Sequence, residues 1–98
     1  MASSREYLDF VLEQLAALDG VSYRAMMGEY LIYCRNRLVG GVYDDRLLVK
    51  PTKSALALLP DAPREEPYPG GRPMLLVTEM ENKRLLQRVL EAIADEVK

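Results

Sequence analysis

Histidine and tryptophan are absent from this chain of 98 residues, and cysteine occurs once. Without histidine the chain lacks the commonest general base and the commonest neutral metal ligand of proteins. Zinc sites need clustered cysteines or histidines, so Cys34 alone excludes that class of site and also any internal disulfide. No glycine-rich phosphate-binding loop is present either. We therefore expect a protein that is not an enzyme, with no metal and no cofactor.

Long apolar runs are also missing. No stretch approaches the roughly 18 apolar residues that a membrane-spanning helix needs. The first ten residues, MASSREYLDF, lack the basic region and apolar region of a secretory signal. Together with the single cysteine, this predicts a cytoplasmic protein that does not insert in a membrane. The net charge of -2 gives the whole chain no attraction to nucleic acid or to anionic lipid.

The composition that is present is typical of one soluble globular domain spanning residues 1–98. Hydrophobic residues make up 49% and charged residues 29% of the chain, close to the average of such domains. A domain of this length buries roughly two-thirds of the surface of its unfolded chain. Domains this small often gain stability by forming dimers, so we expect a homodimer.

Two segments have the pattern of amphipathic helices. Near the N-terminus, Ser3 and Glu6 have the spacing of a capping box, and Gly20 is a good left-handed helix end. The apolar residues between them recur at helical spacing and predict a helix from about Ser4 to Asp19. They are Leu8, Val11, Leu12, Leu15 and Leu18.

Near the C-terminus, Thr78 and Glu81 have the same capping-box spacing ahead of a long apolar stripe. Its members are Leu86, Val89, Leu90, Ile93 and Val97, and they predict a long C-terminal helix. A shorter helix is expected in the middle of the chain, capped by Thr52 or Ser54 and running through Leu59, where Pro60 ends it.

Four short strands are expected between the first two helices. Residues rich in aromatic and β-branched side chains alternate with turn residues. The turns are predicted at Gly28, at Arg35-Asn36-Arg37 and at Asp44-Asp45, and they are short enough to force antiparallel pairing. The strands are Val21 to Met27, Tyr30 to Cys34, Leu38 to Tyr43, and Arg46 to Lys50.

A fifth strand is predicted at Met74 to Val77, which is continuously apolar as a buried strand would be. The proline-rich segment from Pro60 to Pro73 before it is expected to be a surface loop. The element order is thus α-β-β-β-β-α-β-α. It predicts a two-layer α+β fold in which helices cover one face of an antiparallel sheet of about five strands.

Few residues suggest chemistry. Cys34 is a candidate nucleophile beside Arg35 and Arg37, but it lies in an apolar strand and a buried structural thiol is favoured. Asp44-Asp45 is favoured as a turn over a carboxylate pair for acid–base work. Glu65-Glu66 is favoured as a solvated part of the loop.

Two other pairs are ambiguous in the same way. Gly40-Gly41 lies inside a strand, where glycine marks a bulge or close packing. Met26-Met27 suits either an irregular core or an adaptable binding surface, and core packing is favoured.

Basic residues concentrate in residues 24–53, where six cationic residues against three acidic ones give a local charge of +3 in a chain of net -2. This segment supplies the candidate interaction surface, which could meet an acidic partner or nucleic acid. A sheet face whose basic residues are simply exposed to solvent is favoured over such an interaction surface. The candidate residues are Arg24, Met26, Arg35, Arg37, Arg46, Lys50 and Lys53.

The same segment resembles the N-terminal domain of the TfoX/Sxy family. Its pattern is Arg-x-Met-Phe/Met-Gly, a strand with a tyrosine, a turn, a second strand and a Leu-x-x-Lys ending. The resemblance extends to the segment that leads into the last strand and covers nearly the whole chain. The matching residues are Arg24-Ala25-Met26-Met27-Gly28, Tyr33, Leu38 to Tyr43, Leu47-Leu48-Val49-Lys50 and Tyr68 to Met74.

The resemblance implies a small α+β fold similar to the type III secretion chaperone class, commonly dimeric. The family's namesakes promote competence gene expression together with a cAMP-responsive activator, and they carry a second, C-terminal helical domain. This chain ends after its last helix, so we expect a stand-alone N-terminal domain. The family has no catalytic residues to carry over, and Arg24 and Gly28 are its defining positions here.

Three functions remain open from the sequence. The first is a non-enzymatic, dimeric interaction module that regulates transcription through a protein of the transcription machinery. The second is direct binding of nucleic acid through residues 24–53, against which the acidic net charge argues. The third is binding of a small anionic ligand in a pocket between sheet and helices by Arg24, Arg37 or Lys50. We favour the first.

Overall fold

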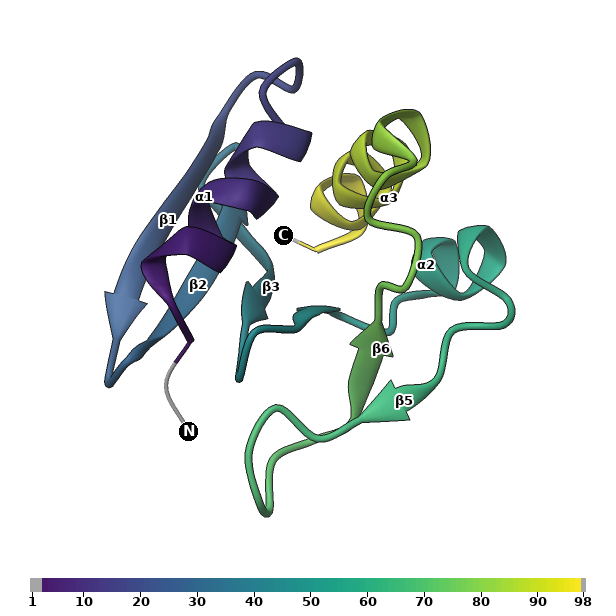
Figure 1. Cartoon of the computed structure of the whole chain (residues 1–98). Helices are drawn as coiled ribbons and strands as arrows, with labels where there is room; N and C mark the ends of the chain where they lie inside the picture. The colour runs from purple at the N-terminus through teal and green to yellow at the C-terminus, as the bar shows by residue number, and fades with distance from the viewer. Residues whose placement is uncertain (1–2, 98) are drawn as a thin grey trace.

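The computed structural model describes residues 3–97 and confirms a two-layer α+β domain (Figure 1). Its sheet has six strands in the order β1-β2-β3-β4-β6-β5, one more than the sequence predicts. All strand pairs are antiparallel. Along the chain the elements are α1 (Arg5–Gln14), β1 (Val21–Met26), β2 (Glu29–Cys34), β3 (Arg37–Val42), β4 (Leu47–Val49), α2 (Lys53–Leu58), β5 (Arg64–Glu65), β6 (Met74–Leu76) and α3 (Lys83–Glu96).

The predicted four-stranded meander is confirmed, and its three turns share one geometry. Each turn has two residues with positive φ: 52° and 86° at Met27-Gly28, 52° and 64° at Arg35-Asn36, and 52° and 55° at Asp44-Asp45. Positive φ at both positions is the requirement of a type I′ turn, whose twist matches that of the flanking strands. Glycine, asparagine and aspartate tolerate this conformation, which is why the sequence locates these turns well.

The glycine pair of β3 marks both a bulge and close packing, as expected. The register between β2 and β3 shifts between Ile32 and Tyr33, so that Val39 is the extra residue of β3. A Cβ atom at Gly40 would lie 2.3 Å from the carbonyl oxygen of Leu48 on β4. Only glycine allows the backbones of β3 and β4 to approach this closely.

The proline-rich segment is more ordered than the sequence predicts. It contains the edge strand β5, which pairs with β6 through Arg64↔Leu75 and Glu65↔Met74. At the tip of this hairpin, Tyr68-Pro69-Gly70-Gly71 forms a turn closed by a hydrogen bond of 2.9 Å from Gly71 N to Tyr68 O. Proline at its second position and Gly70 at its third, with φ of 87°, are the residues that a type II turn requires.

Both predicted capping boxes are wrong in position. Ser4, and not Ser3, caps α1 by accepting a hydrogen bond from Tyr7 N, and α1 ends at Gln14, five residues before Asp19. Asn82, and not Thr78, caps α3 by accepting from Leu85 N. In the middle of the chain Thr52, one of the two predicted caps, accepts from Ala55 N at the start of α2.

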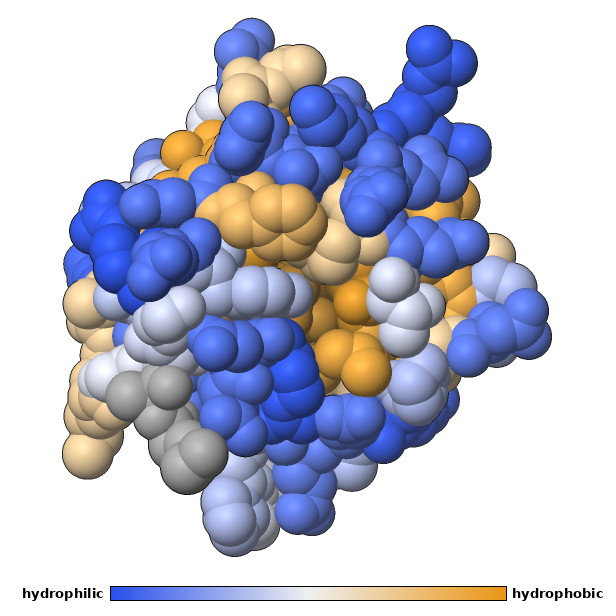
Figure 2. Space-filling model, in the orientation of Figure 1, coloured by the Kyte–Doolittle hydropathy of each residue, from blue (hydrophilic) through white to orange (hydrophobic). Residues whose placement is uncertain are grey.

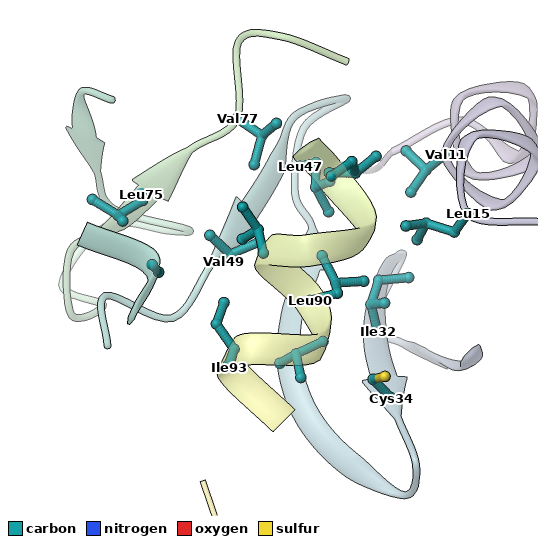
Figure 3. Close-up of a cluster of buried hydrophobic side chains, with 14 of the residues drawn as sticks. Val11, Leu15, Ile32, Cys34, Leu47, Val49, Leu75, Val77, Leu90 and Ile93 are labelled. Atoms are coloured by element: carbon teal, nitrogen blue, oxygen red, sulfur yellow. The ribbon is translucent and has the colours of Figure 1, made fainter. Parts of the chain in front are cut away.

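The core lies between one face of the sheet and the helices (Figure 3). The two predicted apolar stripes supply most of its helical side, and α2 packs beside α3 (Figure 1). Buried members include Leu8, Val11 and Leu15 of the N-terminal stripe and Leu86, Val89, Leu90 and Ile93 of α3. The sheet contributes Ile32, Cys34, Leu47, Val49 and Leu75. In the described residues no helix combines the length and the apolar character needed to cross a membrane.

The opposite face of the sheet, which we call the open face, is not covered by these helices. Directly paired residues share a face of a sheet, so Arg24 pairs with Leu31, and Ser22 with Tyr33, on the side away from the core residue Ile32. Figure 2 views the molecule from the other side, on which α1 lies in front of the sheet (Figure 1), and the surface there is mostly hydrophilic, with hydrophobic residues in a patch near the centre of the view.

Candidate interaction surface

Of the seven candidate residues, Arg24 and Met26 lie together. They are alternate residues of β1 and therefore project from the same side of the strand, the open face. Both are exposed, and Met26 retains 45% of its accessible surface. Within residues 3–97, the Arg24 guanidinium forms no hydrogen bond or ion pair with the rest of the chain.

Arg35 and Arg37 instead hold the end of α3. Arg35 Nη2 lies 2.7 Å from Asp95 Oδ1 and donates to the Glu91 carbonyl oxygen, and Arg37 Nη1 donates to the Ala94 carbonyl oxygen at 2.7 Å. Ala94 lies in the last turn of α3, where carbonyls lack partners within the helix and carry a partial negative charge. These two arginines therefore have a structural role at the junction of the β2–β3 turn and α3.

Arg46 is also engaged within the fold. It forms an ion pair with Glu65 of β5, and its Nε donates to the Tyr43 carbonyl oxygen at 3.1 Å. The contact ties the turn before β4 to the edge strand β5. Glu65, expected as part of a solvated loop, is half-buried by this contact.

Lys50 and Lys53 lie apart from Arg24 and Met26. Lys50 follows β4 and lines a cleft under the β5–β6 hairpin loop, whereas Lys53 is an exposed residue in the first turn of α2. The structure therefore does not gather the seven candidates on one surface. It leaves three groups: Arg24 with Met26, Lys50 in the cleft, and Lys53 on α2.

The expectation that Met26-Met27 packs in the core is wrong. Met27 is 97% exposed at the tip of the β1–β2 hairpin, where it occupies the first left-handed position of the turn. A two-residue turn places the side chains at its tip in solvent. Met26 and Met27 thus place two exposed apolar side chains at the end of β1 and in the turn after it.

β1 is an edge strand six residues long. Only β2 pairs with it in residues 3–97, and five of its six residues are exposed. No proline or lysine interrupts its outer edge, although such residues commonly protect edge strands from pairing with another chain. Tyr23, on the helix side of β1, is packed by the Arg5 guanidinium at 5.3 Å and by the ring of Tyr30.

The cleft beside Lys50 has a volume of about 910 Å³. β3 and the segment between β4 and α2 form one wall, and the β5–β6 hairpin loop forms the other. Two cations, Lys50 and Arg72, line it together with the rings of Tyr43 and Tyr68. Sequence reasoning missed Tyr43, Tyr68 and Arg72 as members of one site. The Tyr-Pro-Gly-Gly turn that folds the loop was the signal available for them.

The remaining chemical candidates have structural roles. Cys34 is fully buried. Asp45 Oδ1 accepts from Ser4 N at 2.8 Å, and Ser3 Oγ donates to Glu29 Oε1 at 2.7 Å and accepts from Asp45 N. These contacts fasten the start of α1 to the β1–β2 and β3–β4 hairpins. Among residues 3–97, no three acidic or cysteine residues are grouped so as to hold a metal ion.

Comparison with known proteins gives one family and one relative. Residues 13–92 match the family described as TfoX N-terminal domain. The chain is 33% identical over 72 residues to an uncharacterized 12.7 kDa protein encoded in the trpE 5' region of Spirochaeta aurantia. This match covers 74% of the chain and 63% of the relative, so the chain spans less than two-thirds of that protein. No solved structure matches the chain.

Proposed function

Because the chain belongs to the TfoX N-terminal domain family, we propose that it is a cytoplasmic, non-enzymatic interaction module of the regulatory type. It acts through contacts with a protein of the transcription machinery and forms a homodimer. The observation that carries the proposal is the exposed edge strand β1, whose open face presents Arg24 beside Met26.

Edge strands bind partners by adding a strand to the sheet. Main-chain hydrogen bonds supply affinity, and alternate side chains supply specificity. Along the open face of β1 the alternate residues are Ser22, Arg24 and Met26. The partner that fits is an extended protein segment with an acidic side chain facing Arg24 and an apolar one facing Met26.

Nucleic-acid binding is the weaker alternative. Three of the six cations between residues 24 and 53 are engaged within the fold by Asp95, Ala94 and Glu65. The other three, Arg24, Lys50 and Lys53, lie in separate places. A phosphate backbone needs several cations along one surface, so this distribution favours the protein partner.

The proposal is tested by affinity capture of the tagged chain from its host lysate, with and without nuclease. We expect transcription proteins to be retained despite nuclease by the wild type and by Arg88→Glu, a matched charge reversal on the exposed face of α3. Arg24→Glu should lose them, because it places like charge against an acidic partner. Partners lost on nuclease treatment, or equal capture by Arg24→Glu, would contradict the protein-contact proposal.

The dimer is tested by light scattering on the purified chain. We expect a mass of twice the 11.1 kDa of one chain, for the wild type and for Arg24→Glu alike. A monomer at all concentrations would contradict the homodimer. If the wild type is a dimer and Arg24→Glu is a monomer, β1 binds a second copy of the chain and not the regulatory partner.

A further inference from the structure

The cleft under the β5–β6 hairpin loop has the composition of a ligand site. We propose that it binds a small molecule that joins an anionic group, phosphate or carboxylate, to a flat apolar body. This inference is independent of the proposed function, which concerns β1. It also differs from the anion pocket that the sequence suggested between sheet and helices, because the cleft opens on the other side of the sheet and of the former candidates only Lys50 lines it.

The charge of the cleft is one-sided. Lys50 and Arg72 line it, and none of its lining residues is acidic. Arg5, Arg35, Arg37 and Arg46 all donate to carboxylates or carbonyls of the chain, whereas the side chains of Lys50 and Arg72 have no such partner among residues 3–97. Two uncompensated cations in one cleft of a chain with net charge -2 favour an anion over any other charged ligand.

The walls of the cleft are apolar and aromatic. The rings of Tyr43 and Tyr68 lie with their centroids 6.4 Å apart at an interplanar angle of 45°. Leu38, Met74 and three prolines supply the rest of the apolar lining. Sites for small molecules combine such walls with a few polar groups and have volumes of about 300 to 1,000 Å³, a range that includes this cleft. An anion alone would leave the apolar walls without a partner.

The cleft is held in shape by the fold. The type II turn at Tyr68 to Gly71 fixes the loop, and buried Pro67 anchors it. Gly41 lets the Tyr43 ring lie close to β3, because a Cβ there would come within 2.6 Å of the ring. Burial raises the pKa of the Tyr43 phenol, and neighbouring Tyr68, Glu29 and Tyr33 add to the effect. Like other tyrosines, Tyr43 is protonated at neutral pH, and its hydroxyl can donate a hydrogen bond.

The two cations can contact the same carboxylate or phosphate group in different ways. The guanidinium of Arg72 presents paired donors that match carboxylate or phosphate, and the ammonium of Lys50 acts as a compact charge. The tyrosine rings then contact the flat body, as aromatic side chains do with planar ligands. A nucleoside phosphate and an aromatic carboxylate share this chemistry, and the experiment distinguishes them.

We would titrate the isotope-labelled full chain with adenosine 5'-monophosphate and with 2-naphthoate, and follow its backbone amides by NMR. Adenosine and inorganic phosphate serve as probes that carry only one half of the chemistry. We expect saturable shifts at Tyr43, Lys50 and Arg72 with one or both of the amphiphilic anions. Adenosine and phosphate should bind at least about tenfold more weakly, since each lacks one set of contacts.

Matched variants locate the site. Lys50→Gln and Arg72→Gln should each weaken binding about tenfold, the effect of losing one charge-assisted contact. Lys53→Gln and Arg64→Gln remove the same kinds of charge from exposed residues that do not line the cleft, and they should leave affinity unchanged. The proposal is wrong if neither anion binds at millimolar concentration, if adenosine binds as tightly as its monophosphate, or if all four variants behave alike.

Discussion

At the scale of single residues, the role of each cation depends on what it contacts and not on its position in the sequence. Arg24 and Arg37 are both candidate interaction residues in the sequence, and they lie in β1 and at the start of β3. Arg37 donates to Ala94 O across a sequence separation of 57 residues, whereas Arg24 projects from the open face. The contact of Arg37 with the last turn of α3 is therefore a stability contact.

We expect Arg37→Ala to lower the free energy of unfolding by about 1 kcal/mol, because it removes a hydrogen bond from a charged donor to a helix-end carbonyl. Arg24→Ala is the control and should change the free energy by less than about 0.5 kcal/mol, as exposed substitutions commonly do. Urea unfolding followed by circular dichroism measures both. Equal effects of the two variants would remove the structural role assigned to Arg37.

Two glycines should differ in their response to alanine. Gly40→Ala places a Cβ 2.3 Å from Leu48 O and must separate β3 from β4, which we expect to cost about 2 to 3 kcal/mol. Gly70→Ala meets no atom within 4 Å but keeps a φ of 87°, so only backbone strain of about 1 kcal/mol is expected. Urea midpoints of the two variants give the comparison. A Gly70 effect as large as that of Gly40 would mean that the hairpin loop packs more tightly than described.

The sequence predicted single residues well only where local chemistry decides their conformation. Gly28 and Asn36 were placed in turns because positive φ is a property of the residue. Arg35, Arg46 and Met26 were misinterpreted because their surroundings come from α3, β5 and solvent, which no local pattern reveals. Of the seven candidate residues of the interaction surface, Lys50 is the one that lines the cleft.

At the scale of elements, the helical spacing of apolar residues located α1 and α3, and the turn residues located the strands of the meander. Hydrogen bonds set where the two helices begin. Ser4 replaced Ser3 as the cap of α1 because Ser3 is bonded to Glu29 and Asp45. β5 escaped prediction because Arg64-Glu65 has neither apolar residues nor alternation. It becomes a strand only because β6 offers an edge with which it pairs.

The junction of α2 and α3 depends on one carboxylate. Glu96, at the end of α3, accepts from Ser54 Oγ at 2.8 Å and from the backbone amides of Lys53 and Ser54. The hydrogen bond from the Ser54 hydroxyl, more than those from the two amides and Thr52, holds the Glu96 pKa below its ordinary value of 4.5. A carboxylate at the start of a helix is also favoured by the helix dipole.

This pKa gives a pH dependence with a definite sign. Because the folded pKa lies below the unfolded one, the stabilisation is present above about pH 4.5 and is lost as the pH falls through the folded pKa. We expect Glu96→Gln to lose less stability than the wild type between about pH 6 and pH 3. Glu91→Gln, an exposed carboxylate on the same helix, is the control and should follow the wild type. Urea midpoints across this range decide, and parallel profiles for Glu96→Gln and wild type would exclude the linkage.

At the scale of the whole molecule, helices and strands from both ends of the chain share one core. Val11 of α1, Ile32 of β2 and Ile93 of α3 belong to the same buried cluster (Figure 3). Cys34 lies in it with no exposed surface. Its thiol therefore becomes accessible only when the sheet separates from the helices.

We expect the thiol of Cys34 to react with an aromatic disulfide reagent orders of magnitude more slowly in buffer than in about 6 M urea, where the chain is unfolded. If labelling requires global unfolding, its rate in buffer rises as the free energy of unfolding falls. Arg37→Ala, which lowers this free energy by about 1 kcal/mol, should therefore accelerate labelling about fivefold. Rapid labelling of the native chain, or a rate insensitive to Arg37→Ala, would show that this part of the core opens locally.

The three two-residue turns of the meander also bear on how the chain folds. They make β1 to β4 a set of contacts between near neighbours in sequence, which form early because little chain entropy is lost in closing each hairpin. The helix that covers Ile32 and Cys34 follows all six strands along the chain. During synthesis α1 is available to cover part of the apolar face of the meander, but the part that α3 covers stays bare until α3 leaves the ribosome. The open edge of β1 is available at the same moment, which makes this nascent stage the one at which the chain is most exposed to aggregation.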